Sequence, residues 1–354
     1  MTEISPPLVG SPLGTAPELA TRYLGLRLRN PLVASPSPLT STVDGVRALA
    51  DAGVGAVVLP SLYEEEVREQ QLRTLALTEP FETAHGEADG YLPRQLTGPD
   101  AATRYLRLVE RAVAAVDVPV MASLNGSTLG GWTAFARQIQ DAGAAALELN
   151  VYLVPGDPHT GAREVEDRHV EILYAVKDAV SLPVAVKLNP YFSSTGEMAV
   201  RLDRAGADGL VLFNRFVHPD VDPERLVVGP APSLSSPTEA RLPRAWIAVL
   251  WSHLSCSLAA TTGVDGPGDV EAYLLAGADV VMTASALLRH GVGHLGVLLD
   301  ELADWLRRKG YDSVDDARAR LAVPHHTDAT AYERAGFVTA LEAARHRYGG
   351  FAQA

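Results

Sequence analysis

The chain of 354 residues carries 30 basic and 43 acidic side chains, which gives a formal net charge of −13 at pH 7. An acidic surface repels phosphate backbones, so a nucleic-acid-binding or anionic-membrane-binding protein is disfavoured. The hydrophobic share of 47% is in the globular range, and one cysteine cannot form an internal disulfide or hold an iron–sulfur cluster.

The N-terminal segment, residues 1–20, contains prolines and acidic residues but no basic stretch followed by an apolar run. It is unlike a secretory signal, and no apolar run in the chain reaches the roughly 18 residues that a membrane span requires. We therefore expect a flexible N-terminal segment and a soluble cytoplasmic protein. Residues 21–30 then predict a short hairpin that leads into the main domain.

A repeated phrase predicts the fold. A helix end, a glycine and an apolar run recur at 51–59, 141–149, 204–212 and 275–283, and further apolar runs alternate with these at 30–35, 118–124, 182–188 and 256–262. Uniformly apolar runs of this length are typical of strands buried on both faces of a parallel sheet. The segments between them, for example 43–52, 132–142 and 164–180, are typical of helices.

Eight strands that alternate with helices predict an α/β fold, a TIM (β/α)₈ barrel. A doubly wound open sheet is the alternative, but eight strands favour closure. We expect one domain, with the barrel over residues 21–310 and a C-terminal helical extension over 311–354. The barrel ends with an amphipathic helix at 294–310, terminated by Gly310.

Long segments follow the predicted strands at 60–98, 150–163 and 214–237. In a barrel these segments gather at the carboxyl ends of the strands, where barrel enzymes have their active sites. We therefore expect the functional site at this end. The segment 60–98 is long enough to contain a helix of its own and to cover the site as a lid.

Lys187 lies in the run VAVKLNP at the carboxyl end of the fifth predicted strand. A lysine there is either directed into the barrel mouth or buried at a cost of several kcal/mol; a side chain that extends to the rim is the structural alternative. Two functional interpretations fit, a fixed cation beside an anionic cofactor and a Schiff-base nucleophile.

Small residues follow the last two predicted strands, in ATTGVDGPG (260–268) and MTASALLRHG (282–291). A strand, small residues and a helix start form the phosphate site of many TIM barrels, where backbone N–H groups contact the anion; tight helix packing is the alternative. The candidate phosphate-binding residues are Gly263, Val264, Ala284 and Ser285.

Three asparagines, Asn125, Asn150 and Asn214, each lie at or just after the end of a predicted strand. Such residues often cap loops, but at one barrel mouth their amides can hydrogen-bond a flat polar ring. Ala34 and Ser35, after the first strand, are small enough for the backbone to approach a cofactor closely. The histidines have no convincing metal-ligand spacing, so no metal site is predicted.

Together these segments resemble the dihydroorotate dehydrogenase family, on its class 1 side. The similarity runs in order through residues 21–309 and is carried by 23–40, 121–132, 141–158, 182–192, 207–215 and 261–287. The resemblance implies a TIM barrel with FMN at its mouth that oxidises dihydroorotate to orotate in pyrimidine biosynthesis. It also implies a homodimer, and an electron-transfer partner is a separate expectation.

Carried onto this sequence, the resemblance assigns the cofactor-binding roles. Ala34 and Ser35 would line the flavin with Asn125 and Asn150, Lys187 would be the cation at its edge, Asn214 would meet the flavin or the pyrimidine, and Gly263, Val264, Ala284 and Ser285 would hold the FMN phosphate. A fixed cation stabilises the negative charge that a flavin acquires on hydride transfer.

The substrate half of the site departs from the family. The position of the family's cysteine or serine base is Val151, which cannot accept a proton, and a lysine that normally ends the second strand is Pro60. Tyr152 is the nearest proton-transfer group, but an ordinary tyrosine pKa near ~10 makes it a poor base at neutral pH.

The sequence therefore predicts an FMN-dependent oxidoreductase that acts on a dihydropyrimidine-like small molecule and whose substrate can differ from dihydroorotate. Two other hypotheses stay open. One is a Schiff-base lyase that uses Lys187. The other is a non-catalytic flavoprotein that passes electrons to a partner.

Overall fold

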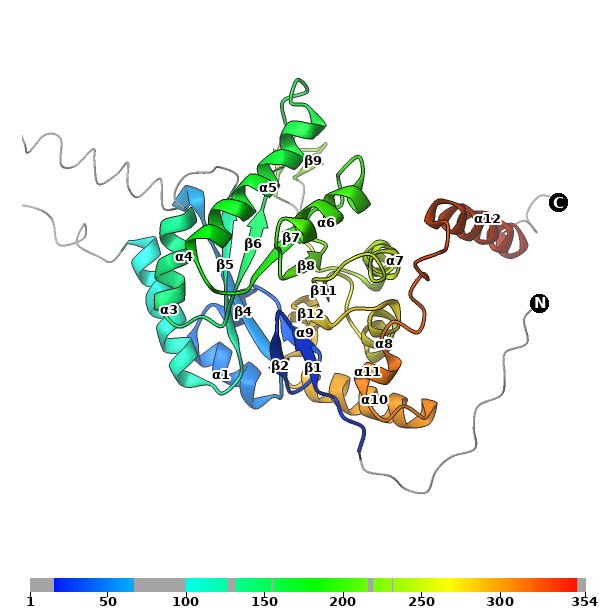
Figure 1. The fold of residues 1–354 in the computed structure, drawn as a ribbon, viewed down its shortest axis with the longest axis horizontal. Helices are drawn as coiled ribbons and strands as arrows, with labels where there is room; N and C mark the ends of the chain where they lie inside the picture. The colour runs from blue at the N-terminus through cyan, green and yellow to red at the C-terminus, as the bar shows by residue number, and fades with distance from the viewer. Residues whose placement is uncertain are drawn as a thin grey trace, which may run out of the picture.

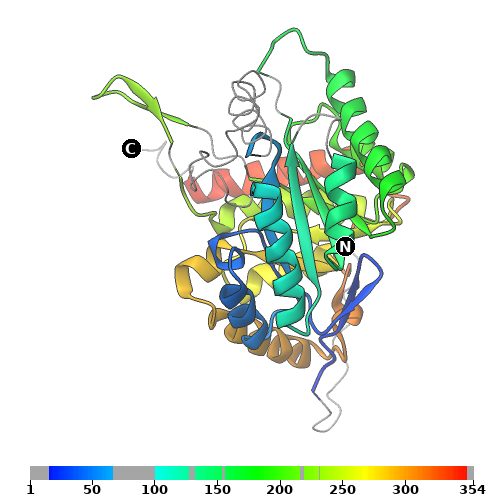
Figure 2. The same cartoon turned by 90° about the vertical axis from the view of Figure 1, so that its left-hand side faces the viewer.

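The computed structural model describes residues 16–66, 100–126, 132–153, 156–215, 219–230 and 232–348. Eight parallel strands close into a barrel (Figures 1 and 2), which confirms the predicted TIM fold and excludes the open sheet. The strands, in order around the barrel, are β3 (Leu32–Ala34), β4 (Ala56–Tyr63), β5 (Val120–Gly126), β6 (Ala146–Val151), β7 (Val184–Leu188), β8 (Gly209–Leu212), β11 (Ser257–Ala260) and β12 (Val280–Thr283).

The helices surround the barrel (Figure 2); most connect consecutive barrel strands, and α9 and α10 follow the last strand, β12. They are α1 (Val43–Asp51), α3 (Ala101–Ala115), α4 (Trp132–Asp141), α5 (Ala162–Ala179), α6 (Thr195–Arg204), α7 (Arg241–Leu250), α8 (Pro267–Ala276), α9 (Ser285–His290) and α10 (His294–Lys309). Short 3-10 helices precede α1 and α7 at η1 (Pro38–Thr40) and η3 (Pro237–Ala240). The glycine of each repeated phrase has a φ between +89° and +120°, as a turn just past a helix requires.

Two hydrophobic clusters build the core. The outer cluster fills the space between strands and helices, and the inner one fills the barrel lumen with residues such as Val33, Val58, Met121 and Val211. Side chains of a strand alternate between these two environments. Each position on a barrel strand therefore faces either the lumen and its mouth or the helices.

The predicted N-terminal hairpin consists of β1 (Thr21–Tyr23) and β2 (Leu26–Leu28), which pair antiparallel. Its Tyr23 is fully buried in the lumen cluster. The Leu24 N–H donates to Ser257 Oγ at 3.1 Å, at the start of β11. The hairpin thus closes the barrel at the amino ends of its strands, which leaves the carboxyl ends for a site.

The chain ends differ from the expected arrangement in detail. In the N-terminal segment, residues 1–15 lie outside the described part, whereas Glu18 is not loose, because it forms a β-bridge with Ser313. The short α11 (Val314–Ala317) packs on the barrel, but the side chains of α12 (Ala329–Tyr348) are almost all exposed and the helix stands away from the barrel (Figure 1). Of the C-terminal extension, the part around α11 therefore packs against the barrel, whereas α12 does not.

A second hairpin, β9 (Asp220–Asp222) with β10 (Val227–Gly229), projects from the body of the protein (Figure 2). The predicted lid falls mostly on residues 67–99, which lie outside the described part.

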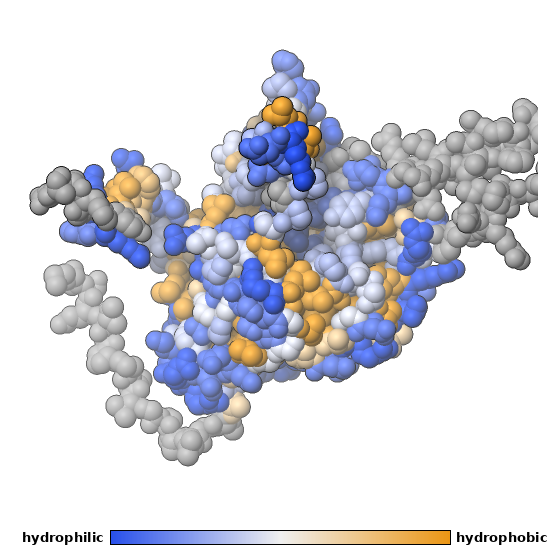
Figure 3. Space-filling view, turned by 180° about the vertical axis from the view of Figure 1, so that it is seen from behind, coloured by the Kyte–Doolittle hydropathy of each residue, from blue (hydrophilic) through white to orange (hydrophobic). Residues whose placement is uncertain are grey.

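Across the described residues, no helix has the length and apolar character to cross a membrane. Seen from behind, the surface mixes hydrophobic and hydrophilic side chains (Figure 3).

Candidate functional site at the barrel mouth

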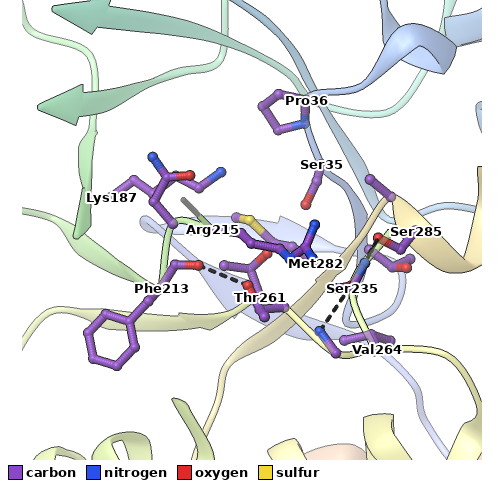
Figure 4. A pocket seen from close by; sticks show the side chains of 15 residues that line it. Ser35, Pro36, Lys187, Phe213, Arg215, Ser235, Thr261, Val264, Met282 and Ser285 are labelled. Atoms are coloured by element: carbon purple, nitrogen blue, oxygen red, sulfur yellow. Dashed lines mark hydrogen bonds between the residues drawn. The ribbon is translucent and has the colours of Figure 1, made fainter. Parts of the chain in front are cut away.

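A cavity opens at the carboxyl ends of the barrel strands (Figure 4). Seven of its lining residues are those predicted from the sequence: Ser35, Lys187, Asn214, Gly263, Val264, Ala284 and Ser285. They come from segments spread over 250 residues of chain, and closure of the barrel brings them together. The structure thus brings these seven residues to one cavity, and their role as a functional site stays a prediction.

Lys187 extends from β7 into this cavity and is only 8% exposed. Alternation along β7 places Ala185 and Lys187 on the lumen side, and alternation along β6 does the same for Ala146 and Glu148. The Lys187 ammonium lies 3.3 Å from Glu148 Oε1, and both side chains are buried. The cation at the mouth is therefore paired with a carboxylate from the neighbouring strand.

The predicted asparagines occupy neighbouring positions at the mouth. Asn125, Asn150 and Lys187 follow one another in register across β5, β6 and β7. Asn214 Nδ2 donates to Asn150 Oδ1 at 2.8 Å, so Asn150 holds the amide that reaches the cavity. Asn125 and Asn150 are buried beside the cavity and do not line it.

The predicted phosphate region is a tight turn that packs on the loop before η3. Gly263 has a φ of +72°, and a Cβ there would lie 2.6 Å from the Ala240 backbone nitrogen. Its N–H donates to Ser235 Oγ at 3.3 Å, and the Ser235 N–H donates to Ser285 Oγ at 3.1 Å (Figure 4). Only glycine permits this close approach, which joins the ends of β11 and β12.

Arg215 adds a cation that the sequence interpretation missed. It lines the cavity directly after Asn214, and its Nε donates to Glu239 Oε1 at 2.8 Å. Its other guanidinium nitrogens contact the Ser233 carbonyl and hydroxyl. The position of Arg215 directly after a strand-end asparagine could have predicted that it lines the cavity. Ser235 could not be predicted in this way, because it reaches the cavity only through the fold of its loop.

Two buried hydroxyls on the cavity wall lack a protein partner. Ser35 Oγ and Thr283 Oγ1 make no hydrogen bond with any residue that the structure describes, although both are shielded from solvent. Unsatisfied buried polar groups are costly and uncommon. Together with an ammonium and a guanidinium, they suit a polar ligand that carries negative charge.

The structure adds detail at three positions on the barrel rim, Ala34, Val151 and Pro60. Ala34 and Val151 belong to the outer cluster, so their side chains face the helices and not the cavity. A cysteine or serine at 151 would face the same way, which removes this position as a base for a second reason. Pro60 lies where the register of β4 against β5 shifts, between Val58 and Ser61.

Tyr152 is 41% exposed and does not line the cavity. Partial burial raises the pKa of Tyr152, and the neighbouring Tyr63 and Tyr191 raise it further. A proton acceptor at neutral pH would need the opposite shift. Tyr152 is therefore unsuited to the catalytic role that the sequence suggested.

The remaining polar clusters are structural in character. His290 and His294 stack at 4.6 Å between ring centroids, and His294 Nε2 bonds the Asp265 carbonyl at 2.8 Å. Within the described ranges, no group of three or more histidine, cysteine or acidic side chains is arranged to hold a metal ion. Cys256 lies near the start of β11, and burial raises the pKa of its thiol above the usual range.

Comparison with known proteins agrees with this geometry. The dihydroorotate dehydrogenase family model matches residues 93–306. Similar proteins include the dihydroorotate dehydrogenase B (NAD(+)) catalytic subunits of Halalkalibacterium halodurans, 32% identical over 49% of this chain and 59% of that protein, and of Methanothermobacter thermautotrophicus, 24% identical over 84% and 96%.

A putative dihydroorotate dehydrogenase A (fumarate) from Aeropyrum pernix is 26% identical over 85% of this chain and 96% of its own length. The match with the Halalkalibacterium protein spans less than two thirds of that relative, whereas the two archaeal matches span almost the whole of theirs. The family model covers more than half of the chain and includes six of the eight barrel strands. By these matches and by its barrel, the chain belongs to the dihydroorotate dehydrogenase family.

Proposed function

We propose that this protein is an FMN-dependent oxidoreductase that oxidises a CH–CH bond of a small dihydropyrimidine-like substrate. The observation that carries the proposal is a buried ammonium, Lys187, on the wall of a cavity at the barrel mouth. Two hydroxyls without a partner among the described residues, Ser35 Oγ and Thr283 Oγ1, belong to the same cavity wall, together with the small residues that follow β11 and β12. This set of groups matches an anionic, amide-rich ring system with a phosphate tail.

The residues divide between the two ends of such a ligand. Gly263, Val264, Ala284 and Ser285 would hold the phosphate with their backbone groups, and Arg215 would contribute positive charge. Lys187, Asn214 and Ser35 would meet the ring and fix its orientation. Bound FMN would supply the hydride acceptor, and the chain would supply the electrostatic field around it.

The substrate is the less defined part of the proposal. Val151, at the family's base position, faces the helices, Tyr152 has a raised pKa, and Pro60, inside β4, stands where the family has a lysine. These features support FMN binding more strongly than turnover of dihydroorotate itself. Dihydroorotate is nevertheless the first substrate to test, because the similar proteins are named for it.

Flavin content tests the proposal directly. We expect purified protein to be yellow, to release stoichiometric FMN on heating and to rebind added FMN after its removal. Anaerobic addition of dihydroorotate, followed at the flavin absorbance, then tests the substrate. Protein that contains no flavin and binds none would refute the function, whereas bound FMN that dihydroorotate leaves oxidised would refute only the substrate.

The Schiff-base lyase is a separate reaction class with its own test. Borohydride trapping with a panel of carbonyl compounds, read by mass at Lys187, would reveal such chemistry. We expect Lys187 to stay unmodified, since it is held in an ion pair at the wall of a polar cavity. A trapped adduct at Lys187 would favour the lyase.

We also propose that electrons leave this chain through a separate acceptor or partner subunit. The similar proteins from Halalkalibacterium halodurans and Methanothermobacter thermautotrophicus are named as catalytic subunits, and one cysteine cannot hold an iron–sulfur relay within this chain. A homodimer is proposed on family grounds, and sedimentation velocity measures it. Reoxidation of the reduced protein by NAD⁺ alone, at a rate that supports turnover, would contradict the need for a partner.

A further inference from the structure

Glu148 is a buried carboxylate for which the proposed function has no assigned role. It is 2% exposed in the lumen of the barrel, and its Oε1 meets the Lys187 ammonium at 3.3 Å. Its Oε2 has no hydrogen-bond partner among the residues that the structure describes. An ionised group with one free oxygen in such a place is costly, so its position calls for an explanation.

Register places Glu148 behind Lys187 as seen from the cavity. Lys187 pairs with Asn150 across β6 and β7, whereas Glu148 pairs with Ala185, two residues nearer to the strand starts. Lys187 lines the cavity and Glu148 does not. A ligand in the cavity would thus meet the ammonium first, with the carboxylate directly behind it.

The surroundings of the pair are otherwise neutral. The lumen cluster below it consists of apolar side chains and Tyr23, and Ser123 on the neighbouring β5 bonds the hydroxyl of Ser61 at 2.8 Å. Of the buried charged residues in the described ranges, Glu166 belongs to helix α5 and lies outside the lumen. On the lumen side of the cavity the charge therefore comes from Lys187 and Glu148, whereas Arg215 and Glu239 form a separate pair after β8 and in η3.

We propose that Glu148 acts through Lys187 as a positioning residue that lowers the reduction potential of the flavin. This inference rests on the proposed function, because it assumes FMN in the cavity. A lone buried cation stabilises the electron-rich form of a cofactor over its neutral form, and a carboxylate beside the cation offsets part of that effect. The pair would hold Lys187 in place while leaving the cofactor ready to pass its electrons onward.

The experiment compares FMN-loaded wild-type protein with Glu148→Gln, which keeps the shape of the side chain and removes its charge. We expect the two-electron midpoint potential, measured anaerobically against a reference dye, to become more positive by at least about 30 mV. That shift is a tenfold change in the reduction equilibrium of a two-electron couple. The FMN dissociation constant of each protein is measured in parallel.

Glu166→Gln is the matched control. Glu166 is also a buried glutamate in an ion pair, with Arg201 at 3.3 Å, but it lies on α5 outside the cavity lining. We expect this substitution to affect stability and to leave the potential unchanged. A loss of packing alone would not move the potential in a defined direction, so the readout separates an electrostatic role from a structural one.

An unchanged or more negative potential in FMN-bound Glu148→Gln would overturn the inference. Should that variant fail to fold, Lys187→Met is compared with the double variant Lys187→Met/Glu148→Gln, in which neutral side chains replace the whole pair. The double variant is expected to be the more positive of the two, and equal potentials or the reverse order would overturn the inference. Wild-type protein that binds no FMN would refute the proposed function itself.

Discussion

A lysine in an apolar barrel strand must either reach solvent at the rim or meet a counter-ion, because an uncompensated buried charge is too costly. Lys187 reaches the edge of a cavity and also pairs with Glu148. The rim position of Lys187 could be predicted from the sequence, because the residue lies at the end of an apolar run. The ion pair with Glu148 could not be predicted in this way, because it depends on the register of β6 against β7.

Replacement of Lys187 tests the site at the residue scale. We expect Lys187→Ala to slow reduction of the bound flavin by roughly 10²–10³-fold, the usual cost of removing one group that stabilises developing charge. Stopped-flow absorbance with the substrate that reduces the wild type measures this rate. Lys177→Ala is the control, because Lys177 pairs with Asp208 away from the cavity; an equal rate in both variants would contradict the assigned role.

Gly263 tests the turn at the phosphate end. We expect Gly263→Ala to destabilise the fold by roughly 1–3 kcal/mol and to weaken FMN binding, because the residue has a φ of +72° and the added Cβ would contact Ala240 and Ser236. Denaturant unfolding and FMN titration measure the two effects. Gly268→Ala is the control, since a Cβ there meets nothing within 4 Å. Equal behaviour of the two variants would show that the turn is not constrained.

At the scale of elements, the 3-10 helix η3 beside the cavity predicts a stability that depends on pH in the acidic range. Its Glu239 closes a capping box with Ser236 and pairs with Arg215. Partial burial alone would raise the pKa of Glu239, but hydrogen bonds from Arg215 and Ser236 hold the pKa below its usual value. The carboxylate therefore stabilises the folded state above its unfolded pKa, and this contribution is lost as the pH falls through the lowered folded pKa.

We expect Glu239→Gln to lower the free energy of unfolding by roughly 0.5 kcal/mol at pH 7, because glutamine can still close the capping box but loses the charge pair with Arg215. The difference from wild type should shrink as the pH falls through the folded pKa of Glu239, because the wild-type side chain then becomes neutral as well. Urea unfolding at a series of pH values measures it. A difference that persists or grows in acid would show that the charge of Glu239 is not what stabilises η3.

The N-terminal hairpin allows a second test at this scale. Tyr23 is fully buried, its hydroxyl has no partner among the described residues, and burial raises its pKa well above the usual value. We expect Tyr23→Phe to be nearly neutral and Tyr23→Ala to cost about 3–5 kcal/mol, because the ring fills the base of the barrel. Denaturant unfolding measures both. A large loss in Tyr23→Phe would reveal a bond to the hydroxyl.

At the scale of the whole molecule, α12 makes little contact with the closed barrel, because its side chains are almost all exposed. The side chains of Phe337, Val338 and Leu341 are each at least 45% exposed, so this helix buries little apolar surface. Removal of residues 329–354 is expected to leave the thermal midpoint of the barrel and its FMN content unchanged. Calorimetry measures the first and absorbance the second; a clear fall in the midpoint would show that α12 stabilises the barrel.

The sequence by itself determined the barrel. Local rules predicted the eight strands, the glycines that end helices and the N-terminal hairpin. A strand buried on both faces requires apolar residues, and a positive φ after a helix favours glycine, so both features can be recognised in the sequence. The same rules located Lys187, Asn214 and Gly263 at strand ends, and hence at one end of the barrel.

Only the tertiary structure decided which way those residues face and what they touch. Ala34 and Val151 are each one position away from residues at the barrel mouth, and the alternation of the strand turns them toward the helices. The contact between Glu148 and Lys187 arises from the register of β6 against β7. The register between neighbouring strands, and the direction in which each side chain points, are fixed only when the whole barrel closes. No local sequence signal specifies which residue of the next strand lies beside a given residue.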